Sequence, residues 1–233
     1  MRPEVLEEML TEFDGCEGDD PGSPASPSIW LFGLEPGWPR ANQEKPATAV
    51  SADPLYSIST QSGSPFNRNA FKLLAAIQGR PVQEYKEFAK EHQPFVKGRK
   101  GYFKGNLFPY ACYKLESWPD ELVQLTGFAN KSAYQHWCQE NRLPVIRQWL
   151  QKYRPRIFIG IGVGFYRQFA LAAHGTDTHL RLETTSSESG AKKLYFGESE
   201  GIKLVVTPHL SRGLTGNKAL QEVGRLIGEF IKR

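Results

Sequence analysis

The chain has 233 residues, enough to build one full hydrophobic core, and its formal net charge of +4 permits a phosphate-bearing partner without requiring one. Its three cysteines include no C-x-x-C pair, which excludes a disulfide framework and a four-cysteine zinc or iron–sulfur centre. The sequence has no apolar stretch near the roughly twenty residues of a membrane span, and its N terminus is acidic and amphipathic rather than cationic and apolar. We therefore expect a cytoplasmic protein with no membrane partner.

The first 27 residues read as a helix followed by a connector. Apolar residues at helical spacing predict a short amphipathic helix over residues 3–13, and residues 14–27 are rich in Gly, Asp, Ser and Pro. We expect residues 28–233 to form one α/β domain.

A buried strand is predicted where the apolar run from Ile29 to Phe32 stops at Gly33. The turn Gly33-Leu34-Glu35-Pro36-Gly37 follows, and it places a carboxylate at the carboxyl end of that strand. Glu35 could equally cap a helix or face water in a tight turn. Residues 40–64 show no clear period, so we expect a long irregular loop there, and such loops in compact domains are usually functional.

The middle of the chain predicts helices and a second strand. Apolar spacing favours helices over residues 67–78 and 82–92, and residues 102–110 read as a strand with its exit loop, which contains Asn106. Residues 132–153 are also helical in pattern, and Pro144 predicts a division into two abutting helices.

The C-terminal part predicts a further strand–turn–helix unit, a hairpin and a closing helix. A buried strand from Ile157 ends in the glycine-rich run 160–164 and is followed by a helix over 165–173. Residues 179–185 and 193–196 alternate like a hairpin, and a last core strand, residues 202–206, leads into the loop 207–214. A helix over 217–232 closes the chain.

These elements together predict an α/β fold, a three-layer α/β/α sandwich with a central, mainly parallel sheet of about four strands. Three of the strands end in polar turns that carry Glu35, Asn106 and His209. Because the carboxyl ends of parallel strands meet at one edge of a sheet, we expect these side chains to surround a common hollow.

The order of the elements and the residues at their ends resemble the uracil-DNA glycosylase superfamily over about residues 29–227. The first motif matches the turn from Gly33 to Gly37, and the last, a His-Pro-Ser-like loop, matches His209-Leu210-Ser211. Between them, Pro65-Phe66 resembles the segment whose aromatic ring stacks on the base, and Asn106 resembles the strand-end asparagine that reads the base edge.

The resemblance implies a DNA glycosylase that flips out a damaged or deaminated base, uracil or a relative, and excises it in base excision repair. Glu35 would activate water and stabilise the sugar cation, while His209 would donate to the departing base. The implied base-binding residues are Gly33, Pro36, Gly37, Phe66 and Asn106. The implied DNA-binding residues are Ser211 on a phosphate and Arg212 or Leu214 as a wedge in the duplex. We expect damaged DNA as partner, a monomer, and no metal or other cofactor.

The chain departs from the superfamily pattern in three places. It lacks the four cluster cysteines of some members, Leu210 replaces the proline of the last motif, and the carboxylate stands third in the first turn. Strict uracil-specific members place a tyrosine after the proline of that turn, whereas this chain has Gly37. We therefore expect a broader or different base preference.

Phe66, Asn106 and His209 could instead each have a purely structural role. Phe66 could be a core residue, Asn106 a turn residue and His209 the cap of a strand or helix end. A member of the superfamily that binds nucleic acid or a nucleotide without cleaving it is the chief rival hypothesis. A Rossmann-type enzyme using residues 160–164 as a phosphate loop is a weaker one, because Phe165 breaks the glycine fingerprint.

Overall fold

The structure is a computed structural model, and the part of the chain that it describes has clear bounds. It describes residues 4, 6, 7, 10, 20–37, 55–110, 112, 117–177, 180–185 and 190–233. The predicted N-terminal helix lies mostly outside the described residues. Trp38 and residues 40–54 of the predicted irregular loop also lie outside them.

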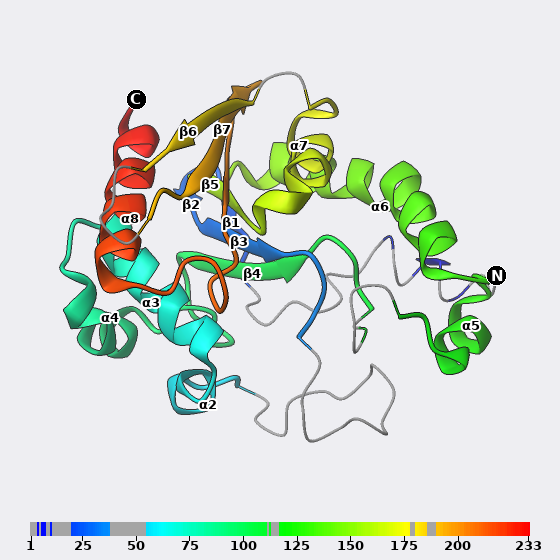
Figure 1. Cartoon of the computed structure of the whole chain (residues 1–233), viewed down its shortest axis with the longest axis horizontal. Helices are drawn as coiled ribbons and strands as arrows, with labels where there is room; N and C mark the ends of the chain where they lie inside the picture. Colours follow the sequence, from blue (N-terminus) through cyan, green and yellow to red (C-terminus); the bar gives the residue numbers. More distant parts are fainter. Residues whose placement is uncertain are drawn as a thin grey trace.

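A six-stranded, mainly parallel sheet organises the fold, with strand order β4-β3-β5-β8-β7-β6 (Figure 1). The strands are β3 (Ile29–Gly33), β4 (Tyr102–Asn106), β5 (Ile157–Ile161), β6 (Arg181–Thr184), β7 (Lys193–Ser199) and β8 (Ile202–Thr207). Strands β4, β3, β5 and β8 run parallel, while at one edge β7 pairs antiparallel with both β8 and β6. The α/β prediction is confirmed, but the sheet is larger than the four strands expected, because the predicted hairpin β6–β7 pairs with β8 and extends it.

The helices cover both faces of this sheet. They are α2 (Ile58–Ser62), α3 (Pro65–Ile77), α4 (Tyr85–His92), α5 (Asp120–Thr126), α6 (Lys131–Tyr153), α7 (Tyr166–His174) and α8 (Asn217–Lys232). Two 3-10 turns, η2 (Val82–Glu84) and η3 (Val163–Phe165), precede α4 and α7. A small hairpin, β1 (Gly22–Ser23) and β2 (Ser26–Pro27), lies within the predicted connector.

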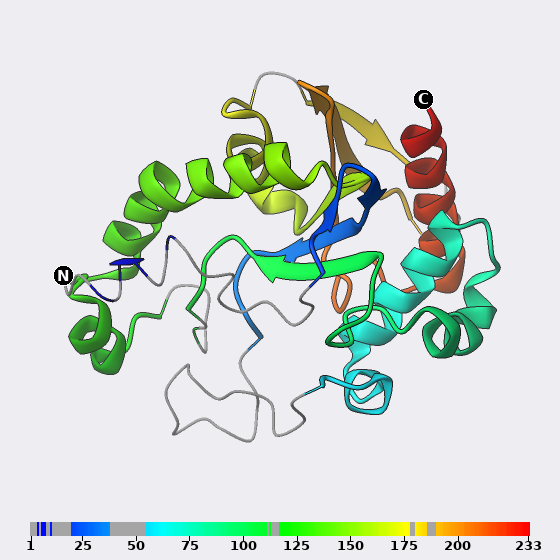
Figure 2. The same ribbon diagram turned by 180° about the vertical axis from the view of Figure 1, so that it is seen from behind.

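Two hydrophobic cores, one on each face, follow from the alternation of side chains along the strands. In β3, Ile29 and Leu31 join a core with α3, α4 and α8, whereas Trp30 and Phe32 join a core with α6 and α7. Figures 1 and 2 show α3 and α8 on one side of the sheet and α6 and α7 on the other. Strands that are buried on both faces explain the continuous apolar runs in the sequence.

Two details of the predicted helices are wrong. Pro144 lies inside the single helix α6 rather than between two helices. The missing proline amide costs one backbone hydrogen bond, but buried residues on both sides of it, among them Tyr134, Cys138, Ile146 and Leu150, pack into the same core. That shared packing holds the helix continuous. The described end of the predicted irregular loop is also ordered, as α2, which Ser57 caps by accepting from the Thr60 amide.

Candidate functional site

The exits of β3 and β4 run side by side at the carboxyl edge of the sheet. Gly33 stands opposite Asn106 in the parallel register. Beyond the strands, the Leu107 amide donates to the Gly33 carbonyl at 3.0 Å and the Phe108 amide donates to the Leu34 carbonyl at 2.8 Å. The turn that carries Glu35 is therefore fixed to the exit of β4.

Asn106 owes its position to the absence of a side chain at position 33. The Asn106 side chain is buried, and a Cβ added at Gly33 would stand 2.6 Å from its Oδ1. Real Cβ contacts of that length do not occur, so glycine is needed here because of close packing. Gly33 and Asn106 therefore pack directly against each other. This packing is compatible with a turn-forming role of Asn106 and with its predicted role in reading the base edge.

Glu35 is buried and ion-paired, rather than standing open at the mouth of a crevice. Its Oε1 and Oε2 lie 2.7 and 2.9 Å from Nζ of Lys131, the first residue of α6. The Lys131 and Glu35 side chains are only 6% and 8% exposed. Burial raises the pKa of Glu35, and the hydrogen bond and charge of Lys131 oppose that rise without cancelling it.

The loop after β8 presents His209 on a tight, well-anchored turn. The His209 carbonyl accepts from the amides of Arg212 at 3.2 Å, Gly213 at 2.7 Å and Leu214 at 3.0 Å. Its Nδ1 accepts from the Ser211 amide at 3.2 Å. The ring is exposed at one side, yet partial desolvation, aided by the nearby Arg212 charge, lowers the pKa of His209 and favours the neutral imidazole.

Helix α3 ties this loop to the candidate stacking residue. Nδ2 of the buried Asn69 donates to the Leu210 carbonyl at 2.7 Å. The half-buried ring of Phe66, at the start of the same helix, lies 5.6 Å from the His209 ring at an angle of 55°. Phe66 is partly buried and also packs against the core beneath it.

A hydrogen-bonded cluster of Lys104, Asn67 and Tyr56, which was not predicted from the sequence, lies beside Phe66. Nζ of Lys104, on β4, donates to Oδ1 of Asn67 at 3.1 Å and lies 5.3 Å from the ring centres of both Phe66 and Tyr56. Asn67 in turn donates to the Tyr56 hydroxyl at 2.8 Å. The Phe66 ring therefore lies near both a cation and an imidazole.

Leu214 is misplaced as a wedge candidate. Leu210 and Leu214 are both fully buried in the core, where they anchor the His209 loop from below. A side chain that enters DNA has to be exposed, and Arg212 is exposed in this loop. At the other turn, Gly37 is exposed, and a Cβ added to it would meet no atom of the described residues within 4 Å, while Pro36 is half-buried.

The predicted residues therefore form two groups at one sheet edge. Gly33, Glu35 and Asn106 gather at the ends of β3 and β4, and Phe66 gathers with His209 and its loop after β8. Residues 38–54, which follow the first turn, lie outside the described residues.

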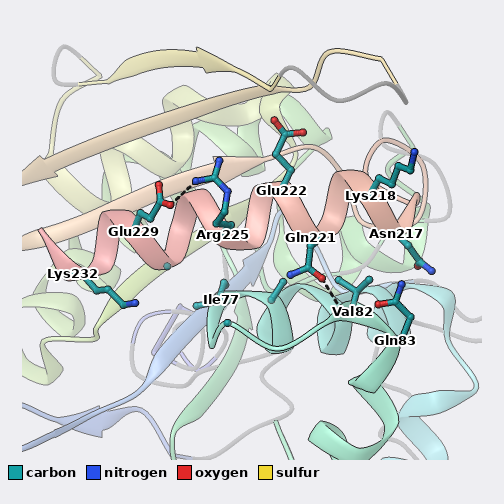
Figure 3. A pocket seen from close by; sticks show the side chains of 13 residues that line it. Ile77, Val82, Gln83, Asn217, Lys218, Gln221, Glu222, Arg225, Glu229 and Lys232 are labelled. Atoms are coloured by element: carbon teal, nitrogen blue, oxygen red, sulfur yellow. Dashed lines mark hydrogen bonds and ion pairs between the residues drawn. The ribbon is translucent and has the colours of Figure 1, made fainter.

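A groove described in the structure lies elsewhere, along α8 and the end of α3, with a volume of about 580 Å³ (Figure 3). None of the predicted site residues lines it. Gln221 accepts from the Val82 amide at 2.8 Å across this groove, which makes it a helix-packing feature.

Lys131 is the most important residue that was not predicted from the sequence. One signal was available: a lysine in the first turn of a helix opposes the helix dipole, so an acidic partner is expected nearby. Asn130 marks that first turn, because its Oδ1 caps the helix by accepting from the Ala133 amide at 2.9 Å.

The glycine-rich turn after β5 has a packing explanation. A Cβ at Gly160 would stand 2.6 Å from the Phe169 ring of α7, and Gly162 adopts a positive φ of 122°. Both glycines are needed to bring α7 close to β5. Packing alone therefore accounts for these two glycines, without a phosphate ligand.

Comparison with models of known protein families finds no match, and a search of curated proteins finds no similar sequence. Within the described ranges, no three His, Cys, Asp or Glu side chains gather as a metal site requires. Of the helices that the structure describes, none is long and apolar enough to cross a bilayer.

Proposed function

We propose that this protein is a DNA glycosylase of the uracil-DNA glycosylase type, which flips a damaged or deaminated base out of DNA and hydrolyses its N-glycosidic bond. The observation that carries the proposal is the gathering at one sheet edge of a carboxylate, an amide, an aromatic ring and an imidazole. Glu35 and Asn106 lie at the ends of the neighbouring strands β3 and β4, and Phe66 contacts His209 after the end of β8.

The reaction needs an anion near the sugar and a hydrogen-bond donor near the base, because the C1′–N bond breaks with positive charge on the sugar and negative charge on the base. Glu35 is the anion, and its raised pKa makes it a stronger base for the attacking water. His209 is a neutral donor near pH 7, because its pKa is lowered. Asn106 can pair with the base edge, and Phe66 can stack on its face, which contributes about 1–3 kcal/mol.

The finer predictions belong to this proposal. They are a three-layer α/β/α sandwich, a glycosylase-like domain over residues 28–233, a monomer, damaged DNA as partner and a cytoplasmic place in base excision repair. The helices on both faces of a mainly parallel sheet support the first of these. The exposed Arg212, beside Ser211, supports contact with the DNA backbone.

Single-turnover release of uracil, thymine, hypoxanthine and xanthine from duplex and single-stranded oligonucleotides tests the proposal. We expect release of at least one base, and a loss of about 10²–10³-fold in Glu35→Gln. Glu198→Gln, which changes an exposed carboxylate on β7, is the matched control and should release bases at the parent rate. Equal rates for the parent and Glu35→Gln would contradict the assignment of Glu35.

One observation favours a second candidate function, a related protein that binds nucleic acid or a nucleotide without cleaving it. Both oxygens of the Glu35 carboxylate are engaged by Lys131, and the side chain is 8% exposed, which limits its access to water. A parent protein that releases no base from any substrate but binds the same DNA would establish this alternative over the glycosylase.

A further inference from the structure

The ion pair between Glu35 and Lys131 is buried, unlike an ion pair on the protein surface. A single ammonium reaches both carboxylate oxygens, at 2.7 and 2.9 Å, and both side chains are more than nine-tenths buried. Exposed pairs contribute little because water and side-chain freedom compete with them. Removing one partner from a buried pair instead strands a charge, so this contact has large consequences for whichever residue remains.

Lys131 occupies a position that is unfavourable for a cation, and Glu35 compensates for this. Lys131 is the first residue of α6, where the positive end of the helix dipole disfavours a cation. Burial of the ammonium adds a further cost. The Glu35 carboxylate offsets both costs, because its charge is opposite to the ammonium and to the helix end.

The other described groups that act on Glu35 carry no positive charge at neutral pH. Gln135, on the next turn of α6, donates a hydrogen bond to Glu35. The Cys112 and Cys138 thiols and the Tyr134 phenol also face it, and burial is the largest cause that raises the pKa of each, which keeps them neutral. Among the described residues that act on the carboxylate, Lys131 therefore supplies the positive charge.

We propose that Lys131 is a positioning residue, which keeps Glu35 ionised and holds its carboxylate in one orientation for the attacking water. The inference rests on the proposed function. In the hydrolytic step the water oxygen bonds to C1′ as the C1′–N bond breaks. The electron pair of that bond leaves with the base, and a water proton passes to Glu35. After the base has left as an anion, Glu35 releases that proton to bulk water and becomes an anion again, while Lys131 keeps its own protons throughout.

Removing the Lys131 charge changes the pH at which Glu35 can act as a base. In Lys131→Met the buried carboxylate loses its cation, so protonated Glu35 becomes favoured. We expect the acidic limb of the pH–rate profile to move upward by about one to three pH units, the range that a neighbouring cation produces. At a pH below the acidic limb of the parent, the rate then falls by about 10- to 10³-fold, and raising the pH restores it.

Three further variants separate charge from hydrogen bonding and from general damage. Lys131→Arg keeps the charge and should leave the limb near its parent position. Lys131→Gln keeps a donor without charge and should shift the limb as the methionine does. Lys90→Met removes an exposed lysine of α4 and should change nothing. Thermal unfolding identifies any variant that fails to fold. If Lys131→Met or Lys131→Gln does not fold, the other of the two tests the effect of removing the charge.

A readout that needs no activity keeps the two proposals separable. Carbon-13 NMR titration of the Glu35 side-chain carboxyl, assigned by its absence in Glu35→Gln, reports the ionisation of this group directly. A midpoint of the Glu35 titration that lies at higher pH in Lys131→Met and Lys131→Gln than in the parent, but not in Lys131→Arg, supports the inference. An unchanged titration, or a slower rate with an unshifted pH profile, overturns it. A parent that releases no base overturns the proposed function, whatever the titration shows.

Discussion

Gly33→Ala is a perturbation of known size at the centre of the candidate site. The added methyl carbon would stand 2.6 Å from Oδ1 of Asn106, below the 3.0 Å that real contacts respect. The backbone at Gly33 needs no positive φ, so alanine introduces no backbone strain, and the clash falls on the Asn106 carboxamide. That group has to retreat by about 0.4 Å or more, with an off-rotamer cost of about 0.5–1.5 kcal/mol.

This displacement predicts a larger effect on function than on stability. Misplacing a positioning group by about 1 Å costs about 10²-fold in rate, so we expect about tenfold slower base release for a shift of half that size. The Tm should fall by only about 2–4 °C for each kcal/mol of strain. Single-turnover kinetics, differential scanning calorimetry and the NMR shifts of the Asn106 side-chain amide provide the measurements.

Gly37→Ala is the matched control for this variant. It lies in the same turn and also adds one methyl group, but that methyl would meet nothing within 4 Å. We expect its Tm and its Asn106 amide shifts to equal those of the parent. Equal behaviour of the two alanine variants would refute the role assigned to the contact between Gly33 and Asn106.

Three further predictions concern other parts of the site. Asn69→Ala removes the buried hydrogen bond to the Leu210 carbonyl and should lower the free energy of unfolding in urea by about 1–3 kcal/mol, whereas an unchanged value would show that the loop needs no anchor. Arg212→Ala changes an exposed residue, so stability should hold while the slope of log binding constant against log salt falls by about one; a slope equal to that of the parent would exclude a phosphate contact. Gly37→Tyr fills open space beside the turn and should narrow base release toward uracil, and an unaltered base panel would contradict this.

Three central strands were predictable because their residues are largely buried on both faces of the sheet. Strands β3, β5 and β8 appear in the sequence as short apolar runs, and all lie in the sheet close to the expected positions. The hairpin was predictable from its alternation, but its pairing with β8 was not, because alternation does not specify which neighbour a strand joins. Pro144 misled the helix prediction, because core packing on both sides overrides a local preference.

The candidate site was predictable only in part. The turn residues Glu35, Asn106 and His209 follow strand ends, and topology alone places strand ends at one edge. Lys131 was missed because its partner is 96 residues away along the chain, a separation at which local patterns carry no signal. Leu214 was misassigned because the sequence shows an apolar residue in a loop without showing which way its side chain points.

The hydrogen bond from Asn69 to the Leu210 carbonyl joins segments 141 residues apart into one rigid unit. The ring of Phe66 and the imidazole of His209 lie on that unit, while the side chains of Leu210 and Leu214 fix its base in the interior. Because the hydrogen bond and the buried leucine side chains fix this surface, we expect its conformation to change little when a ligand binds. The conformational adjustment on binding therefore falls on the ligand.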